Sequence, residues 1–229
     1  MIAEPTFTIP KLSPGFDANI TLPGSKSIAL RQLAISALVS GTSRITGIPE
    51  CDDTDAMIDC LKALGVTIET QGASLLVTGP MDFGSQPVEL NARMSGASTR
   101  LLIGLAALRT GSTLIDGHDS LRVRTNAPLF DVLCEHGCQI DSDEGQLPAT
   151  ISGPIRVQDA LVIDGSLSSQ YITALMVVAP VLAHRQGINQ QVIHIDGDLV
   201  SRPYIDLTLN EMSKRSVVGH WANPETLNI

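Results

Sequence analysis

Short apolar runs alternate with longer amphipathic stretches along this chain, and the same order of elements recurs three times. In the first copy the pattern predicts a strand over 18–22, a helix over 28–39, a strand over 43–47, a helix over 53–64 and strands over 66–69 and 74–78. Gly65 and Gly137 stand where equivalent helices stop, about 70 residues apart, which suits a βαβαββ unit and exceeds the common solenoid repeats.

The second and third copies follow the same plan with different endings. The second has a strand starting at residue 88, a helix over 101–108, a strand over 113–116 and a helix from Asp119 or Ser120 to Glu135. The third has a strand over 160–164, a helix to about residue 182, a strand over 192–196 and a helix over 201–214. Its closing strand pair is expected to be absent or vestigial, because only Val217 and Val218 precede a polar tail.

Strands that alternate with helices imply βαβ crossovers and sheets with a parallel component, so the predicted fold class is α/β. We expect a single lobe over 18–215, made of three βαβαββ units at about 18–79, 88–154 and 159–215. Residues 216–229 are interpreted as a truncated or atypical tail. Residues 1–17 hold three prolines and one short extended stretch, and are set apart from the lobe.

The composition narrows the class of partner. A hydrophobic content of 43% suffices for a buried core, while a net charge of -9 argues against general affinity for nucleic acid or an anionic membrane. Any anion site must therefore be local. A secretory leader and a long apolar run are not evident, so a cytoplasmic protein is expected. Four cysteines at 51, 60, 134 and 138 are interpreted as reduced structural thiols, and we assign no metal ion or cofactor.

The first helix of every copy opens on a turn of Ser and Gly, written GSKS, MSGAS and GSLSSQ. Exposed N–H groups and the positive end of the helix dipole make each turn a candidate anion site. Ordinary N-capping explains any one of them equally well. Three such turns in equivalent positions favour the anion sites.

Basic side chains stand beside these turns, at Lys26, Arg31, Arg100 and Arg124. Cations at a helix N-terminus oppose the macrodipole, so helix stability does not explain them, whereas an anionic ligand does. GSKS lacks the glycine spacing of a nucleotide-binding P-loop. The acidic run at 52–55 is interpreted as capping of the next helix at its positive end.

Four segments, LPGSKSIALRQLAISAL, MSGASTRLL, GSLSSQYITAL and GDLVSRPYIDLTL, closely resemble 5-enolpyruvylshikimate-3-phosphate synthases in order and spacing. The resemblance covers about residues 20–212. It implies an inside-out α/β barrel type of fold, with two lobes of three βαβαββ units each and an active site between them. The implied reaction is enolpyruvyl transfer from phosphoenolpyruvate to shikimate 3-phosphate, a step of aromatic amino-acid biosynthesis.

The resemblance also implies roles for ten residues. Lys26, Arg124 and Gln170 are expected to be catalytic. Lys26, Gly96 and Arg124 would contact phosphoenolpyruvate, and Gln170 would lie between the two substrates. Six further residues would hold shikimate 3-phosphate: Ser27, Arg31, Ser168, Ser169, Ser201 and Tyr204.

Three positions depart from the family pattern. Met94 stands where an Asn is usual, Ala97 where a Thr is usual, and Thr125 where a Pro usually follows the arginine. Two polar groups are thereby lost near the phosphoenolpyruvate pocket. We expect weaker phosphoenolpyruvate binding and reduced sensitivity to glyphosate, which occupies that pocket in relatives.

The largest departure is length, since family members are nearly twice as long. Residues 1–17 are expected to belong to the missing C-terminal lobe, which would supply further catalytic groups, and a homo-oligomer or a complementing lobe would close the site. Two other interpretations stay open: a non-catalytic module that binds shikimate 3-phosphate, and the sister enzyme that transfers enolpyruvyl to UDP-N-acetylglucosamine. Arg31 and the Ser-Ser-Gln motif disfavour the sister enzyme.

Overall fold

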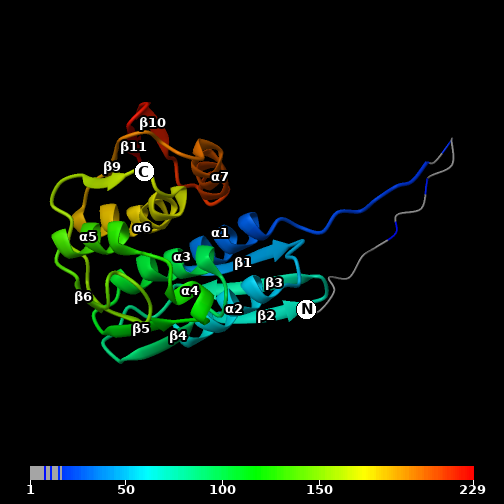
Figure 1. Ribbon diagram of the computed structural model, residues 1–229, viewed down its shortest axis with the longest axis horizontal. Coiled ribbons are helices and arrows are strands. Elements are labelled where there is room, and N and C mark those ends of the chain that lie inside the picture. Colours follow the sequence, from blue (N-terminus) through cyan, green and yellow to red (C-terminus); the bar gives the residue numbers. More distant parts are fainter. Residues whose placement is uncertain (1–7, 9–10, 12–14, 16) are drawn as a thin grey trace.

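The computed structural model describes residues 8, 11, 15 and 17–229, and its elements are labelled in Figure 1. Their order is α1 (Lys26–Ser36), β1 (Gly41–Thr46), α2 (Asp52–Ala63), β2 (Thr67–Gln71), β3 (Ser74–Gly79), β4 (Val88–Asn91), α3 (Gly96–Ala107), β5 (Ser112–Asp116), α4 (Asp119–Arg122), α5 (Ala127–Glu135), β6 (Gln139–Ser142), β7 (Ala149–Ser152), β8 (Leu161–Asp164), α6 (Ser169–Gln186), β9 (Val192–Asp196), α7 (Arg202–Ser213), β10 (His220–Asn223) and β11 (Thr226–Asn228).

Three separate sheets form the outside of the lobe. Their strand orders are β1-β3-β2, β4-β5-β7-β6 and β10-β11-β9-β8. The second and third sheets each contain one parallel pair, β4 with β5 and β8 with β9, and their other pairs are antiparallel. Each parallel pair is linked through a helix, α3 or α6, because parallel strands need a crossover connection between them.

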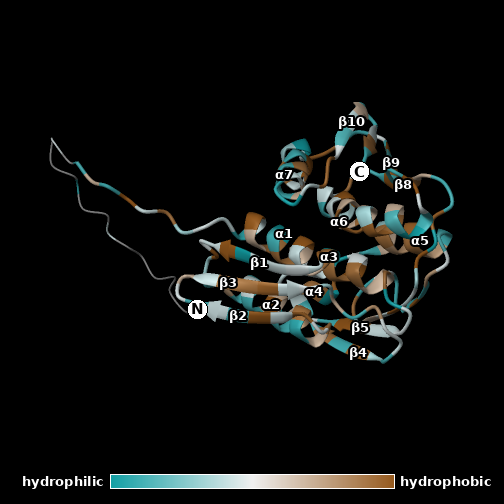
Figure 2. Cartoon of the chain, turned by 180° about the vertical axis from the view of Figure 1, so that it is seen from behind, coloured by the Kyte–Doolittle hydropathy of each residue, from teal (hydrophilic) through white to brown (hydrophobic). Residues whose placement is uncertain are grey.

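The helices α1, α3 and α6 lie side by side inside the ring of sheets (Figure 1). A helix that is buried on most sides is hydrophobic nearly all round, and α3 and α6 have this composition. In Figure 2 the hydrophobic colouring gathers where these helices meet, while α7 is largely hydrophilic. Gly104 permits the close approach, because an added Cβ would lie 3.1 Å from the Ala174 carbonyl oxygen. Helices inside and sheets outside confirm the α/β class.

The first predicted strand is wrong. Residues 17–25 form neither strand nor helix, and the side chains of Ile20 and Leu22 are 78% and 80% exposed. The apolar pattern of 18–22 suits a strand, but a strand needs a hydrogen-bonded neighbour, and β1 pairs only with β3 among the described residues.

The long helix predicted from Asp119 or Ser120 to Glu135 is also wrong, because it is two helices, α4 and α5. Pro128 lies in the first turn of α5. A proline there has no N–H, and inside a continuous helix its ring would clash with the carbonyl four residues earlier. The helix therefore restarts at Ala127, and the residues between the two helices carry Arg124 on a loop.

The third unit does have a closing strand pair, contrary to prediction. β10 and β11 form a hairpin, and β11 pairs with β9 through Leu227 opposite Ile193. Leu227 is fully buried, and the Trp221 ring stacks under the Arg202 guanidinium at 4.2 Å and donates to Asp206 at 2.9 Å. These contacts stabilise a segment whose own sequence shows little strand pattern.

Most of residues 1–17, which were assigned to a further lobe, lie outside the described residues. Within the described part of the chain, each helix is too short or too polar to cross a lipid bilayer.

Candidate functional site

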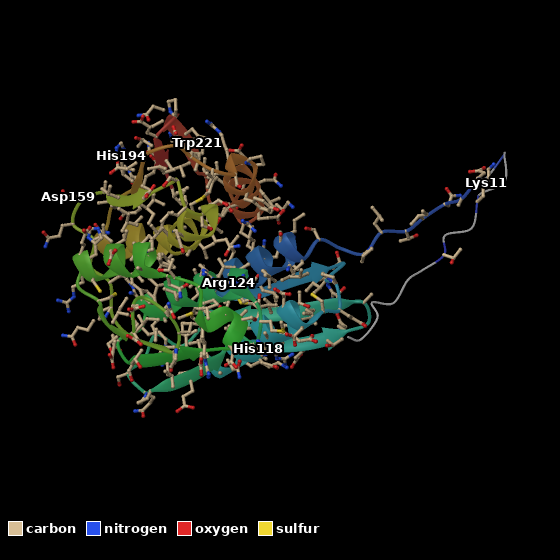
Figure 3. All side chains as sticks on the ribbon, in the orientation of Figure 1. Lys11, His118, Arg124, Asp159, His194 and Trp221 are labelled. Atoms are coloured by element: carbon tan, nitrogen blue, oxygen red, sulfur yellow. The ribbon has the colours of Figure 1, made fainter. Side chains whose placement is uncertain are left out.

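A cavity of about 620 Å³ opens on the face where α1, α3, α6 and α7 begin. All ten residues predicted for the site line it, together with Leu30, Asp53, Met94, Ala97, Leu101, Leu167, Thr173 and Val200. Figure 3 places Arg124 near the centre of the molecule, whereas Asp159, His194 and Trp221 lie towards the edge of the view. The three units, distant in sequence, therefore contribute to one site.

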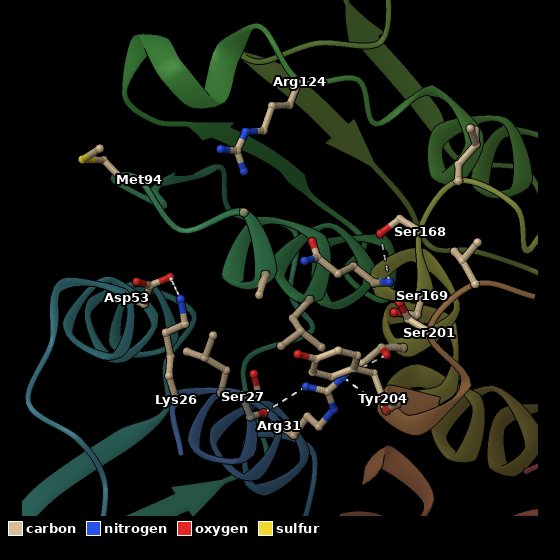
Figure 4. A pocket seen from close by; sticks show the side chains of 18 residues that line it. Lys26, Ser27, Arg31, Asp53, Met94, Arg124, Ser168, Ser169, Ser201 and Tyr204 are labelled. Carbon is tan, nitrogen blue, oxygen red and sulfur yellow. Dashed lines mark hydrogen bonds and ion pairs between the residues drawn. The ribbon is translucent and has the colours of Figure 1, made fainter. Parts of the chain in front are cut away.

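Helix N-termini surround this cavity (Figure 4). Ser95 and Ser168 cap α3 and α6, accepting hydrogen bonds from the backbone N–H groups of Ser98 and Gln170. Ser25, the N-cap residue of α1, makes no such side-chain bond. Backbone N–H groups that helices leave free, and the positive dipole ends, favour a bound anion. The capping interpretation is correct for two turns and does not conflict with anion binding.

Lys26 crosses the cavity from the first turn of α1 to Asp53 in the first turn of α2, with 3.3 Å between Nζ and Oδ1. Both side chains are partly exposed, at 49% and 27%. An exposed pair of this kind adds little stability, so an anionic ligand can compete for Lys26 at small cost. Sequence analysis assigned Asp53 to helix capping alone and missed its place in the cavity wall.

Arg31 lines the cavity but is only 6% exposed. Its Nε donates to Thr208 Oγ1 at 2.8 Å, and its terminal nitrogens donate to the Ser27 carbonyl at 2.9 Å, Thr173 Oγ1 at 3.2 Å and the Tyr204 carbonyl at 3.3 Å. A guanidinium carries five N–H donors, so one is left for a ligand. Burial lowers the pKa of Arg31. Through its hydrogen bonds to Thr173, Thr208 and Tyr204, the residue connects α1 to α6 and α7.

Two arginines converge on the start of α3. An ideal Cβ on Gly96 would lie 3.0 Å from an Arg100 nitrogen and 3.2 Å from an Arg124 nitrogen. Arg100 is buried and donates to the carbonyls of Gly96 and Thr125, and burial lowers its pKa, with the charge of Arg124 acting in the same direction. Tyr171 also donates to the Thr125 carbonyl, at 2.8 Å. Arg100 and Tyr171 thus hold the loop that carries Arg124.

The Arg124 side chain is exposed and is directed into the cavity (Figure 4). With the described residues its guanidinium forms neither a hydrogen bond nor an ion pair, and the neighbouring Arg100 is a further cation. Several cations line the cavity, and Asp53 is its one lining carboxylate among the described residues. The cavity is therefore locally positive, although the chain has a net charge of -9. Such a site suits a small ligand with two anionic groups.

Hydroxyl groups line the opposite wall, at Ser168, Ser169, Ser201 and Tyr204. Ser169 is 7% exposed, at the first residue of α6. Ser201 adopts a left-handed backbone with φ 59° and ψ 42°, which is uncommon for a residue other than glycine. Gln170, the next residue of α6 after Ser169, is exposed and lines the cavity as well.

Two of the three departures from the family pattern lie at the cavity, and the third, Thr125, is not among its lining residues. Met94 and Ala97 both line it, and Met94 is 59% exposed. The sequence did not point to Thr173 and Thr208, which hold Arg31. Each is a single threonine within a helix, α6 or α7, and such a residue is too common to identify a role.

Comparison with known proteins connects this geometry with a family. Residues 13–218 match the family model for EPSP synthase (3-phosphoshikimate 1-carboxyvinyltransferase). A 3-phosphoshikimate 1-carboxyvinyltransferase of Bordetella pertussis is 37% identical over 202 residues, which are 86% of this chain and 46% of the relative. One of Colwellia psychrerythraea is 35% identical over 207 residues, 88% of this chain and 47% of the relative. The chain thus spans about half the length of the curated relatives it matches.

Solved structures agree on the fold. An EPSP synthase from Acinetobacter baumannii superposes with a TM-score of 0.73 at 20% identity, covering 92% of this chain and 46% of that one. The enolpyruvyl transferase NikO from Streptomyces tendae gives a TM-score of 0.60 at 17% identity, over 90% of this chain and 47% of that one. With the family model matching nearly the whole described chain, this protein belongs to the EPSP synthase family.

Proposed function

We propose that the cavity binds shikimate 3-phosphate and phosphoenolpyruvate, and that the chain contributes one wall of an active site for enolpyruvyl transfer. The observation that carries this proposal is the convergence of all ten predicted site residues, from three units, on a single cationic cavity. Relatives named 3-phosphoshikimate 1-carboxyvinyltransferase support the choice of substrates. By the same resemblance we assign the protein to the cytoplasm.

The shikimate phosphate is assigned to the hydroxyl wall. Ser168 and Ser169 stand at the N-terminus of α6, where hydroxyl and backbone N–H groups together suit phosphate oxygens. Ser201 stands at the start of α7 and Ser27 in the first turn of α1. Tyr204 and the remaining N–H donor of Arg31 lie at the border of the same region. The ring of shikimate 3-phosphate would therefore lie between α1 and α6.

Phosphoenolpyruvate is assigned to the side formed by Lys26, Gly96 and Arg124. The planar fork of Arg124 suits a carboxylate or phosphate through two parallel hydrogen bonds. Gly96 lets the ligand approach the backbone N–H groups at the start of α3. The side chains of Met94 and Ala97 offer no hydrogen-bond donors there, so we retain the expectation of weak phosphoenolpyruvate and glyphosate binding.

The transfer has two steps. The 5-hydroxyl oxygen of shikimate 3-phosphate bonds to C2 of phosphoenolpyruvate, its proton leaves to a base, and C3 gains a proton. The adduct then breaks its C2–O bond to phosphate, and C3 loses a proton to restore the double bond. In this proposal Lys26 moves a proton and Arg124 stabilises the departing phosphate. Gln170 orients the hydroxyl between the two ligands.

A binding module without turnover is the second candidate. One observation favours it. Lys26 and Asp53 are the cavity-lining side chains best suited to carry a proton within the described residues, and they are paired with each other. The cavity therefore lacks a separate acid and base for the two proton transfers of the reaction. The rival UDP-sugar transferase has no comparable support.

Phosphate release tests the proposal. The purified chain is mixed with both substrates, alone and with a C-terminal lobe from a relative, and inorganic phosphate is measured. We expect release with the complementing lobe and about a hundredfold less in Arg124→Ala, the loss typical of a removed oxyanion donor. Arg156→Ala, an exposed arginine outside the cavity, is the matched control. Shikimate 3-phosphate binding without phosphate release in any mixture would favour the module instead.

A further inference from the structure

The loop that carries Arg124 begins at a very short helix. α4 has four residues, and Leu121 is the only one of them that is buried. A helix of one turn is not stable by itself, so its position depends on contacts with the rest of the lobe. One buried side chain fixes a point of the turn but leaves its orientation free. A second contact must therefore set the direction in which the chain leaves α4 towards Arg124.

Arg122, the last residue of α4, makes this second contact. Its Nε donates to Oδ1 of Asp116 at 2.9 Å, and one terminal nitrogen donates to Oδ2 at 2.7 Å. The other terminal nitrogen donates to Asp119 at 3.2 Å. Two parallel hydrogen bonds to one carboxylate fix the plane and the direction of a guanidinium, which a single hydrogen bond does not. Asp116 is therefore the main anchor of Arg122.

Asp116 is itself held in place. It is the last residue of β5, and its carbonyl oxygen accepts a hydrogen bond from the Ala92 N–H at 2.8 Å. Its Oδ1 also accepts a hydrogen bond from the Gly117 N–H at 2.7 Å. The Arg122 guanidinium holds the pKa of Asp116 below its usual value, and the Gly117 N–H acts in the same direction. A charged carboxylate is thus fixed at the end of a paired strand.

The pair of Arg122 and Asp116 lies outside the cavity. Neither residue is among those that line it, and their side chains are partly exposed, at 44% and 31%. Partly exposed ion pairs contribute little to the stability of a fold, and bidentate pairs of arginine and carboxylate are the exception. The pair therefore does not bind a ligand in the cavity, and its effect is on the segment that follows α4.

Arg124 lies between two anchors. Val123, which separates it from Arg122, is 72% exposed and adds no packing. On the other side, the carbonyl of Thr125 accepts hydrogen bonds at 3.1 Å and 2.8 Å from side chains of α3 and α6. Because the Arg124 guanidinium has no bonding partner among the described residues, its direction depends on its backbone (Figure 4). That backbone is fixed only while both anchors hold.

We propose that Arg122 is a positioning residue, whose paired hydrogen bonds with Asp116 hold α4 so that Arg124 is directed into the cavity. Arg122 acts through the backbone and touches no ligand itself. Its charge is offset by Asp116 and Asp119, so Arg124 presents the free guanidinium to an anion. The consequence for phosphoenolpyruvate rests on the proposed function, whereas the hold on the loop does not.

Backbone ¹⁵N relaxation of the ligand-free chain tests the hold on the loop. Asp116→Asn places an NH2 group opposite one prong of the Arg122 guanidinium, whereas Asp119→Asn removes the same charge and leaves the paired bonds intact. We expect the order parameter of the Arg124 amide to fall from about 0.85 to below about 0.6 in Asp116→Asn and to stay near 0.85 in Asp119→Asn. Equal order parameters in the two variants would overturn the proposal.

Arg122→Gln is the second variant for this measurement, and it keeps the test decisive if Asp116→Asn does not fold. It removes the guanidinium and leaves Asp116 in place. The order parameter of the Arg124 amide should fall as far as in Asp116→Asn, because the same two hydrogen bonds are lost. An unchanged order parameter in Arg122→Gln would also overturn the proposal.

Titration with phosphoenolpyruvate separates positioning from electrostatic attraction. Asp116→Asn and Asp119→Asn each remove a negative charge near a cationic cavity, so attraction alone predicts tighter binding in both variants. Positioning predicts about tenfold weaker binding in Asp116→Asn, the value of one charge-assisted hydrogen bond from Arg124, and no weakening in Asp119→Asn. The affinity for shikimate 3-phosphate should be the same in both. Unchanged or tighter phosphoenolpyruvate binding in Asp116→Asn would contradict positioning.

A double-mutant cycle shows whether Arg122 acts through Arg124. In an Arg124→Ala background, Arg122→Gln should weaken phosphoenolpyruvate binding no further, because the residue that it positions is gone. A further loss as large as that in the unaltered background would show that Arg122 acts on the ligand directly, and would overturn the proposal. A loosened loop in Asp116→Asn, with no phosphoenolpyruvate binding even to the unaltered chain, would keep the hold on the loop and reject the proposed function.

Discussion

At the residue scale, the most instructive side chain is Arg31. Sequence motifs assigned it to the substrate, and it does line the cavity, but four of its five N–H donors bond to protein atoms. Besides the nearby Ser27 carbonyl, its partners come from α6 and α7, about 140 to 180 positions away in sequence. A motif identifies which residue is present, but the partners of a guanidinium depend on tertiary packing, which the sequence does not display.

Arg31→Ala is accordingly expected to destabilise the lobe. Removal of the guanidinium leaves a cavity and takes away the donor from which the Thr208 and Thr173 hydroxyl oxygens accept, at a cost of about 2–4 kcal/mol in the free energy of unfolding. Urea unfolding measures this cost, with the exposed Arg156→Ala as control. A loss below the scatter of the control would show that Arg31 belongs to the ligand alone. Weakened binding in Arg31→Ala therefore cannot by itself identify a ligand contact.

Two buried thiols make stability depend on alkaline pH. Burial raises the pKa of Cys60 to about 11 and of Cys138 to about 12, from 9.0. Above pH 9 the unfolded chain releases these protons first, so it binds fewer protons than the folded lobe and the free energy of unfolding falls as pH rises. The stabilising effect is complete below pH 9.

Urea unfolding in a reducing buffer at pH 8, 9 and 10 checks this dependence. Between pH 9 and 10 each thiol should contribute a decrease of about 1 kcal/mol, so the decrease should be smaller by that amount in Cys138→Ala. An identical decrease in the variant and the unaltered chain would show that Cys138 is solvated.

At the scale of elements, the sequence predicted what depends on local pattern and missed what depends on neighbours. The first helices of all three units were placed within a few residues, because long apolar runs after a Ser/Gly turn are strong signals. The break at Pro128 was missed, although a proline inside a helical pattern is itself a signal of one. The hairpin of β10 and β11 was missed because its stabilising contacts, Leu227 on β9 and Trp221 on Arg202, are tertiary.

The crossing of α3 and α6 offers a test at this scale. Gly104 lies against Ala174 and Val178, with 3.1 Å and 3.4 Å available to an added Cβ. Gly104→Ala should change stability by less than about 1 kcal/mol, because helix propensity offsets the tight contact. Gly104→Leu should cost about 2–3 kcal/mol, since overpacking separates the helices. Chemical denaturation of both variants measures the difference, and equal stability would mean that the helices do not meet at Gly104.

At the scale of the whole molecule, three repeated units bring three helix N-termini and the start of α7 to one face. No single turn identifies a ligand site, because N-capping explains each one separately. Their convergence, with Lys26 and Arg124 directed into the same cavity, turns four ordinary helix starts into one cationic wall (Figure 4). The motif order predicted this grouping of residues. The sequence alone could not predict their distances or the pairing of Lys26 with Asp53.

The most direct test of the account is a calorimetric titration of the purified chain with shikimate 3-phosphate and, separately, with shikimate, which lacks the phosphate. We predict saturable binding of the phosphorylated ligand only, weakened about tenfold in Ser169→Ala because one hydroxyl contact to a charged group is lost. Ser213→Ala, a serine at the far end of α7, should bind as the unaltered chain does. Equal affinity for the two ligands, or an unchanged affinity in Ser169→Ala, would contradict phosphate recognition by these helix N-termini.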